Sequence, residues 1–378
     1  MKNVLFTGGR SPFTLDLTRL FATSGFNVYI ADTFKDNMSG NSKYAKKNIL
    51  LASPALKTED FIQDLIDIII EYKIDLLIPT CEEVFYVGKY LKKLEKFCKV
   101  FVSDISVLEQ LHSKYKFIGI LNKLDIKHPK SERVSDINVL KNRLQYKEKF
   151  VLKPEFSRFA STVFINDKNI DNIKINKEYP WVLQEFIDGN AFCSYSVAQN
   201  GKLLAHGVYP SIYCAGKATI HFKSVKVSEI EEIVTKIVKN FDYTGQISFD
   251  FIQSKEDNIY YPIECNPRGT SGTHLFSKKL SKAFLNETNG KVIYPDLENP
   301  RMVALAMLIY ELPTIRNIDD SKEFFRDFYK SKDVVFRVGD MKPFISQFKS
   351  LNHYAKIARK NNISLTEAIM YDIEWNGN

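Results

Sequence analysis

The chain has 378 residues, of which 44% are hydrophobic and 26% are charged. This composition is typical of an ordinary globular protein with room for two or three domains. The formal net charge is +8, but the lysines are spread along the chain without a basic block, so we expect no nucleic-acid partner. The longest apolar run, residues 302–310, has about half the length of a membrane span and predicts a buried helix and no membrane association.

The spacing of the cysteines and the first residues of the chain indicate in which cellular compartment the protein is expected. Five cysteines are scattered along the chain without a C-x-x-C spacing, which is typical of reduced thiols rather than of a disulfide framework. The opening residues "MKNVLFTGG" pass directly into strand-like sequence, without the features of a signal peptide. We therefore expect a cytoplasmic protein.

The first hundred residues alternate between strand-like and helix-like segments. Residues 3–32 predict a strand, a glycine turn, an amphipathic helix and a second strand that ends at Asp32. Residues 58–80 repeat the order of helix and buried strand, and residues 100–104 predict another strand. This alternation predicts a parallel α/β domain over residues 1–110.

The glycine turn "TGGRSP" (residues 7–12) suggests one alternative function. A dinucleotide site at this turn, with Asp32 nearby, would make the protein an NAD(P)-dependent oxidoreductase. The turn differs, however, from the G-x-G-x-x-G pattern of dinucleotide-binding domains. The alternative also gives no role to the polar residues that follow along the chain.

From residue 111 the pattern changes to isolated polar residues within apolar strands. A predicted helix carries Lys114, and a predicted strand, "KFVLKP", ends near Lys153. A second apolar strand, "WVLQEFIDG", covers residues 181–189. Next come a predicted hairpin with Asn200-Gly201 at its turn and a predicted helix over residues 228–240.

Two further strands, "GQISFDFIQ" (245–253) and "YYPIECN" (260–266), predict an acidic hairpin. Because side chains alternate along a strand, Glu264 and Asn266 share one face, and Asp250 is expected opposite Glu264. Oxygen ligands suit Mg²⁺, and two adjacent carboxylates repel unless a cation lies between them. The pattern predicts a metal site; a hairpin with solvated acids on its outer face is the alternative.

Taken in order, these segments resemble the ATP-grasp superfamily, in particular its carbamoyl-phosphate-synthetase-like and biotin-carboxylase-like branch. The resemblance covers about residues 1–290. It implies an α/β protein with a Rossmann-like pre-ATP-grasp domain (1–110) and an ATP-grasp domain (111–290). The nucleotide would bind between the halves 111–180 and 181–290, and residues 291–378 would form a mostly helical region.

The resemblance also implies roles for individual residues. The phosphates of ATP would contact Lys114, Lys153 and Ser161, and the hinge strand around adenine would contain Gln184, Glu185, Phe186 and Ile187. The ligands of two Mg²⁺ ions, with Mn²⁺ as an alternative metal, would be Asp250, Glu264 and Asn266. Arg268 would be the catalytic residue, placed beside the transferred phosphoryl group.

The chain departs from the family pattern at two places. The loop "PEFSRFASTVF" after Lys153 contains no glycine, whereas the family's phosphate-covering loop is normally glycine-rich. Ala191 stands about where the family tends to carry a glutamate for the ribose hydroxyls. Ribose recognition is therefore expected from another group, such as Glu185.

The function implied by the resemblance is that of an ATP-dependent ligase. It would phosphorylate a carboxylate to an acyl phosphate and couple it to an amine, as amino-acid or small-peptide ligases do, with release of ADP and phosphate. Its partners would be small-molecule substrates and a second copy of the chain in a homodimer. A catalytically silent ATP-binding protein is a further alternative, which the presence of Asp250, Glu264, Asn266 and Arg268 disfavours.

Overall fold

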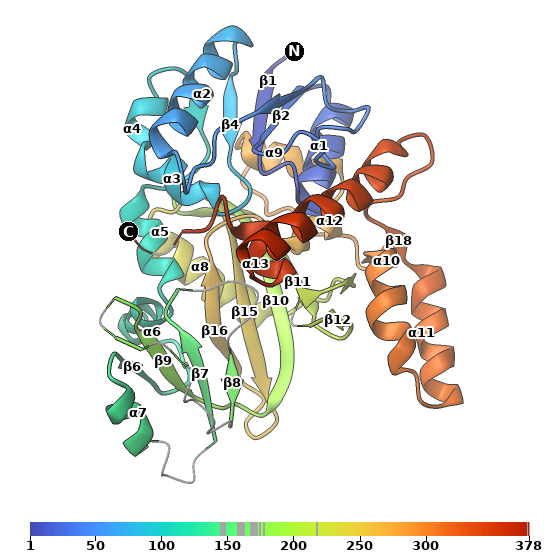
Figure 1. Ribbon diagram of the computed structural model, residues 1–378. Helices are drawn as coiled ribbons and strands as arrows, with labels where there is room; N and C mark the ends of the chain where they lie inside the picture. Colours follow the sequence, from blue (N-terminus) through green and yellow to red (C-terminus); the bar gives the residue numbers. More distant parts are fainter. Residues whose placement is uncertain are drawn as a thin grey trace.

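Figure 1 shows the computed structural model of the protein. The structure describes residues 1–143, 149–156, 163–166, 173, 175, 176, 178–216, 218–375 and 377. Within these residues the strands form five sheets: one parallel sheet near the amino terminus, two four-stranded antiparallel sheets and two smaller ones.

The amino-terminal sheet is parallel and has the strand order β3-β2-β1-β4-β5. Its strands are β1 (Asn3–Thr7), β2 (Asn27–Asp32), β3 (Lys47–Leu50), β4 (Leu76–Ile78) and β5 (Lys99–Val100). Its helices are α1 (Pro12–Thr23), α2 (Thr58–Glu71), α3 (Glu83–Lys89), α4 (Leu91–Leu94) and α5 (Ile105–His112). Alternation along β1 separates two cores, because Leu5 packs with α2 residues whereas Val4 and Phe6 pack with α1 residues.

A small antiparallel sheet follows, with the order β6-β9-β7-β8. Its strands are β6 (Ser131–Val134), β7 (Phe150–Pro154), β8 (Phe164–Ile165) and β9 (Trp181–Glu185), and the neighbouring helices are α6 (Lys114–Lys123) and α7 (Ile137–Arg143). Leu152 and Trp181 belong to its own small core. The strand expected to carry Lys153 is therefore a central strand of this sheet.

The larger antiparallel sheet has the order β11-β10-β15-β16. Its strands are β10 (Gly189–Gln199), β11 (Lys202–Pro210), β15 (Gly245–Ser254) and β16 (Tyr260–Asn266). Asn200 and Gly201 turn the β10–β11 hairpin with φ values of 50° and 69°, as the expected two-residue turn requires. Helix α8 (Ser228–Asn240) covers the sheet through Ile230, Val234 and Ile237, in the same core as Phe249.

The remaining chain combines short strands and helices. The short strands are β12 (Cys214–Ala215), β13 (Ala218–Thr219), β14 (His221–Phe222), β17 (Arg301–Met302) and β18 (Lys332–Asp333). The helices are η1 (Ser271–Leu275), η2 (Lys278–Leu280), α9 (Ser281–Phe284), α10 (Ala304–Ala306), η3 (Met307–Glu311), η4 (Leu312–Thr314), α11 (Ile318–Lys330), α12 (Lys342–Asn361) and α13 (Leu365–Met370). Figure 1 shows α12 and α13 crossing back towards the parallel sheet.

The expectation of a buried helix over residues 302–310 is wrong in two respects. Met302 lies in β17, and the helical part begins only at Ala304. Met307 is buried against Ile220 and Phe324, but Ile309 and Tyr310 are 54% and 53% exposed. The helix stands at the periphery with α11 (Figure 1), so one side of it reaches the core and the other side faces outward. Among the described residues, no helix is long and apolar enough to cross a membrane.

Candidate active site

The acidic hairpin has the expected register. Asp250 on β15 lies directly opposite Glu264 on β16, and the amide of Asn266 donates a hydrogen bond to Asp250 Oδ2 at 3.3 Å. On its other side Asp250 pairs with Cys193 of β10. The Glu264 side chain is only 22% exposed. The alternative of solvated acids on an outer face is therefore wrong.

Burial and mutual repulsion perturb the two carboxylates differently. Burial raises the pKa of Asp250 to about 6, and the negative charge of Glu264 acts in the same direction. Burial also opposes ionisation of Glu264, but the cations of Lys114 and Lys153 outweigh it and lower the pKa of this carboxyl. Glu264 is thus the charged partner, and a further cation beside Asp250 would relieve the repulsion between them.

The donor set fits a hard cation that also binds a phosphate-bearing ligand. Two carboxylates and one amide oxygen are what Mg²⁺ typically takes from a protein when phosphates and water supply its other ligands. The described part of the chain holds no group of three or more His, Cys, Asp and Glu side chains arranged for a metal. These residues therefore suit a metal shared with a ligand better than an ion caged by the protein alone.

Two buried lysines approach neighbouring residues of β16 from different elements. Lys114 is the first residue of α6, and its Nζ lies 3.7 Å from Glu264 Oε1. Lys153 on β7 donates from Nζ to the carbonyl oxygen of Ile263 at 3.0 Å. Both side chains are almost completely buried. Positive charge thus approaches the carboxylate pair from two directions.

Gln184 holds Lys153 in place. Its Oε1 accepts a hydrogen bond from Lys153 Nζ at 3.0 Å, while its Nε2 donates to Ser131 Oγ at 3.0 Å. Gln184 is itself buried. Its side chain therefore orients the lysine, a role that the sequence reading of the hinge strand did not anticipate.

The hinge residues after Gln184 form hydrogen bonds with other segments of the same chain. Glu185 donates its backbone N–H to the carbonyl of Lys130 at 2.8 Å, and its carboxylate accepts from the Lys130 N–H at 3.0 Å. Phe186 donates its N–H to the carbonyl of Lys149 at 3.2 Å. Ile187 follows in a half-buried position. Two backbone N–H groups of the predicted adenine hinge are thus committed to other parts of the protein, and Ser161 lies outside the described residues.

Arg268 is fixed by three hydrogen bonds in the loop after β16. Its Nη2 donates to Asn266 Oδ1 at 2.9 Å, and its Nη1 donates to the carbonyl of Gly269 at 3.2 Å. Its Nε donates to Glu82 Oε1 at 3.0 Å. Glu82 is fully buried at the start of α3. An acid of the amino-terminal segment therefore orients the predicted catalytic arginine.

Glu82 and Glu155 are buried partners of the predicted site residues, and sequence reasoning missed both of them. Glu82 lies in the stretch "PTCEE" (79–83), and no local pattern of the sequence indicates its pairing with Arg268. Glu155, two residues after Lys153, is buried and accepts hydrogen bonds from Ser113 Oγ and from Arg133 Nε. Its carbonyl also accepts from the Lys114 N–H at 3.3 Å. It thereby ties together the two segments that carry the lysines.

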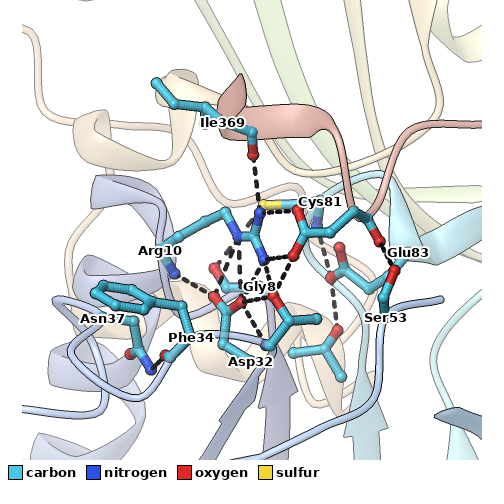
Figure 2. A network of polar contacts seen from close by, with 12 residues as sticks. Gly8, Arg10, Asp32, Phe34, Asn37, Ser53, Cys81, Glu83 and Ile369 are labelled. Carbon is cyan, nitrogen blue, oxygen red and sulfur yellow. Dashed lines mark hydrogen bonds and ion pairs between the residues drawn. The ribbon is translucent and has the colours of Figure 1, made fainter. Parts of the chain in front are cut away.

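Figure 2 shows the glycine turn of the amino-terminal segment, where Arg10 lies among acidic side chains. Arg10 is buried, with Nη2 2.6 Å from Asp32 Oδ1 and Nη1 2.7 Å from Asp372 Oδ1. Arg10 Nη1 also donates to the carbonyl of Ile369 at 2.8 Å. Asp32 is thus committed to Arg10, and the carboxy-terminal segment covers the turn. This arrangement disfavours the dinucleotide alternative.

Comparison with known proteins identifies the class to which the site belongs. Residues 111–272 match the ATP-grasp domain family. The chain is 27% identical over 228 residues to the mitochondrial arginine-specific carbamoyl phosphate synthase large chain of Schizosaccharomyces pombe. That match covers 54% of this chain and about a fifth (20%) of the length of the curated relative. The chain thus carries an ATP-grasp domain, and the resemblance seen in the sequence is confirmed.

Solved structures share the fold at low sequence identity. An L-amino acid ligase from Bacillus licheniformis aligns with a TM-score of 0.61 and 16% identity, over 79% of this chain and 78% of that one. N5-carboxyaminoimidazole synthetase from Staphylococcus aureus, complexed with ADP, aligns with a TM-score of 0.64 and 12% identity, over 86% and 97%. The biotin carboxylase domain of 2-oxoglutarate carboxylase from Hydrogenobacter thermophilus aligns with a TM-score of 0.59 and 12% identity, over 79% and 73%. The mixed α/β ATP-grasp fold therefore extends over most of the chain.

Proposed function

We propose that the protein is an ADP-forming carboxylate–amine ligase. The observation that carries this proposal is the convergence on β16: Glu264 faces Asp250 across the hairpin, with Lys114 Nζ 3.7 Å away. Such a site combines positive charge for phosphates with oxygen ligands for a divalent cation. The structural relatives agree, since one is an L-amino acid ligase and two were solved with ADP or MgADP.

The reaction would proceed in two steps. A carboxylate oxygen of the first substrate attacks the γ-phosphorus of ATP, so that ADP leaves and an acyl phosphate forms. The nitrogen of an amine then attacks the acyl carbon, phosphate leaves, and the amine loses a proton. Neither step needs a nucleophile from the protein, whose contribution is positioning and electrostatic stabilisation.

The lysines, the acidic hairpin and Arg268 each have a task in this scheme. Lys114 and Lys153 supply positive charge beside the phosphates, and Gln184 holds Lys153. The side-chain oxygens of Asp250, Glu264 and Asn266 are the proposed ligands of Mg²⁺, for which Mn²⁺ is an alternative. When bound, the metal neutralises charge on the β- and γ-phosphates.

Arg268 is the proposed catalytic residue. Its guanidinium is fixed by Glu82 and Asn266, so a planar, permanently charged group stands next to the proposed metal ligands. Donors that are held in place before the reaction stabilise developing charge without reorganising during it. This position suits the transferred phosphoryl group and the acyl phosphate.

The finer organisation is also part of the proposal. The nucleotide would bind between residues 111–180 and 181–290, with a Rossmann-like domain before it (1–110) and a mostly helical region after it (291–378). The substrates would be a small carboxylic acid and an amine such as an amino acid. A homodimer is supported by exposed apolar side chains in the carboxy-terminal region, among them Ile318 and Tyr329 at 74% and 81% exposure. Light scattering would contradict the dimer if it gave a mass near the 43.6 kDa of one chain.

The experiment that tests the ligase is a screen of ADP release with pools of amino acids and carboxylic acids, followed by mass spectrometry of the product. We expect one pair of pools to stimulate ADP formation and to yield a product whose mass equals both substrates minus one water. Lys153→Ala is the control for contaminating ATPase. Tight ATP binding without stimulation by any pool would favour the catalytically silent alternative, and tight NADH binding without ATP binding would favour the oxidoreductase.

A further inference from the structure

A pocket of about 650 Å³ is lined by residues of α1, of η1 and the segment that follows it, and of the β17–β18 region. Its lining includes five arginine and lysine side chains against two aspartates among the described residues. The lining residues are different from those that we assign to ATP and metal. The pocket is therefore a concave surface with an excess of positively charged side chains.

Both aspartates of the pocket are already engaged with the protein. Asp333 accepts hydrogen bonds from the backbone N–H groups of Ala304 at 3.1 Å and Phe336 at 2.9 Å. Asp16 accepts from His274 Nδ1 at 2.6 Å. These carboxylates compensate part of the positive charge, and Asp16 Oδ1 also lies 4.0 Å from Arg19 Nη1, but the cations of the lining still outnumber them.

The cations differ in how much of their charge is compensated. Arg19 is buried, and it donates to Asp340 at 2.9 Å and to the carbonyl of Val334 at 2.7 Å, so it belongs to the wall. Lys278, Lys332 and Arg337 are exposed. Arg301 is half-buried on β17, between the wall and solvent. It is therefore the best placed of these cations to anchor a ligand.

Two buried polar atoms of lining residues have no hydrogen-bond partner among the described residues. They are Nε of Arg301 and Nε2 of His274. His274 is only 2% exposed, and its other ring nitrogen is held by Asp16. Buried polar atoms in native proteins are nearly always paired. Both atoms are closed to solvent in this structure, so a ligand in the pocket would reach them only after the side chains move.

Most of the remaining lining residues are apolar, among them Leu20, Phe276 and Phe336. An inorganic anion alone would leave this surface without a partner. We propose that the pocket binds a small organic anion, in which a carboxylate or phosphate group contacts Arg301 and an apolar body packs on these side chains. The lining shares no residue with the proposed nucleotide site, so anion binding here can be tested independently of the ligase assignment.

Calorimetry on the full chain tests the proposal with two probes, benzoate and phenyl phosphate, and with uncharged benzyl alcohol as the control ligand. We expect at least one anion to bind, while benzyl alcohol does not. The tighter anion indicates whether the group is a carboxylate or a phosphate. Arg301→Gln should weaken binding by about tenfold or more, because a hydrogen bond to a charged group is lost. Exposed Lys239→Ala on α8 is the matched control and should bind as the wild type does.

Two further variants make the outcome decisive. Lys153→Ala should retain anion binding, because Lys153 belongs to the proposed nucleotide site. If this variant no longer binds the anion, the anion occupies the nucleotide site and the proposal is overturned. Lys332 is exposed, so Lys332→Ala should fold normally and weaken binding severalfold even if Arg301→Gln fails to fold. Absence of binding by both anions, or unchanged binding in both the Arg301 and Lys332 variants, would also overturn the proposal.

Discussion

Arg268 and Glu82 are 186 residues apart in the chain, yet Arg268 Nε donates to Glu82 Oε1 at 3.0 Å. The arginine follows the acidic strand β16, and the glutamate directly precedes helix α3 of the amino-terminal segment. Both side chains are almost completely buried. The pair therefore connects the amino-terminal segment to the loop after β16, directly beside the proposed metal ligands. A weaker Arg268–Glu82 bond would leave the arginine less firmly oriented.

Glu82→Gln should slow ADP formation by about tenfold or more while leaving ATP affinity nearly unchanged, because a charge-assisted hydrogen bond that orients Arg268 becomes a neutral one. Steady-state kinetics would show the loss in kcat rather than in KM. Glu83→Gln is the matched control. Glu83 accepts hydrogen bonds from the backbone N–H groups of Thr80 and Cys81 and not from Arg268, so this variant should lower the stability of the fold without a specific loss of kcat. Equal kcat in folded Glu82→Gln and wild type would contradict the positioning role.

Lys153→Ala should weaken ATP binding by about tenfold or more, because a buried cation beside the phosphates is lost. Gln184→Ala should weaken it less, since it removes only the hydrogen bond that orients the lysine. Calorimetric titration with ATP and Mg²⁺ checks both variants. Equal ATP affinity in Lys153→Ala and wild type would remove this lysine from the site.

Glu264→Gln should abolish turnover and change the Mg²⁺ requirement of ATP binding. Glutamine is nearly isosteric with glutamate, so the fold should survive, but the formal charge that faces the metal is lost. The measurement is ATP binding at a series of Mg²⁺ concentrations, with melting curves as the control for folding. Normal Mg²⁺ dependence together with normal turnover would show that β16 is not the metal face.

Arg268→Ala should leave metal and nucleotide binding nearly intact but reduce turnover by about a hundredfold or more, roughly 3 kcal/mol. The reason is that its proposed interaction develops only as the phosphoryl group is transferred. ADP production under saturating ATP measures the effect. A folded variant that turns over at the wild-type rate would reduce the arginine to a structural partner of Glu82.

Asp372→Asn should lower the free energy of unfolding at neutral pH by about 2 kcal/mol, because a charged hydrogen bond from buried Arg10 is lost. Burial opposes ionisation of Asp372, but the charge and hydrogen bonds of Arg10 outweigh it and lower the pKa of this carboxyl. A carboxyl whose pKa is lower in the folded protein stabilises it above the unfolded value of about 4 and loses this effect as the pH falls. Urea unfolding should therefore show a lower free energy of unfolding for Asp372→Asn than for the wild type at pH 7, and this difference should shrink as the pH is lowered.

The matched control for this prediction is Asp319→Asn, because the side chain of Asp319 is 91% exposed. Exposed ion pairs contribute little to stability, so this variant should unfold as the wild type does at every pH. A stability difference in Asp372→Asn that stays constant with pH would show that packing, rather than the charge of Asp372, holds the carboxy-terminal segment.

Local pattern was sufficient for much of the fold and for the acidic face. Alternation along "FDF" and "IECN" predicted that Asp250 lies opposite Glu264, and the register of β15 with β16 agrees. Helix α8 has the predicted bounds, residues 228–240, because its apolar spacing marks one continuous stripe. Asn200-Gly201 turns its hairpin as predicted, since these residues tolerate positive φ.

Residues 302–310 show where local pattern was insufficient. An apolar run indicates a preference for burial but does not say how many sides of a helix the fold can cover. Here Met307 reaches the core while Ile309 and Tyr310 stay exposed. Only the arrangement of α10 and α11 at the periphery of the molecule decides this outcome.

The sequence by itself determined the carboxylate pair, because strand alternation places Asp250 opposite Glu264, whereas the resemblance to ATP-grasp proteins indicated Lys114 and Lys153. Only the tertiary structure decided which partners hold them. Glu82 orients Arg268, Gln184 orients Lys153, and Asp372 covers the glycine turn through Arg10. These contacts join residues that are far apart in the sequence. Which of them meet depends on how the sheets pack against one another, and local periodicity carries no information about that packing.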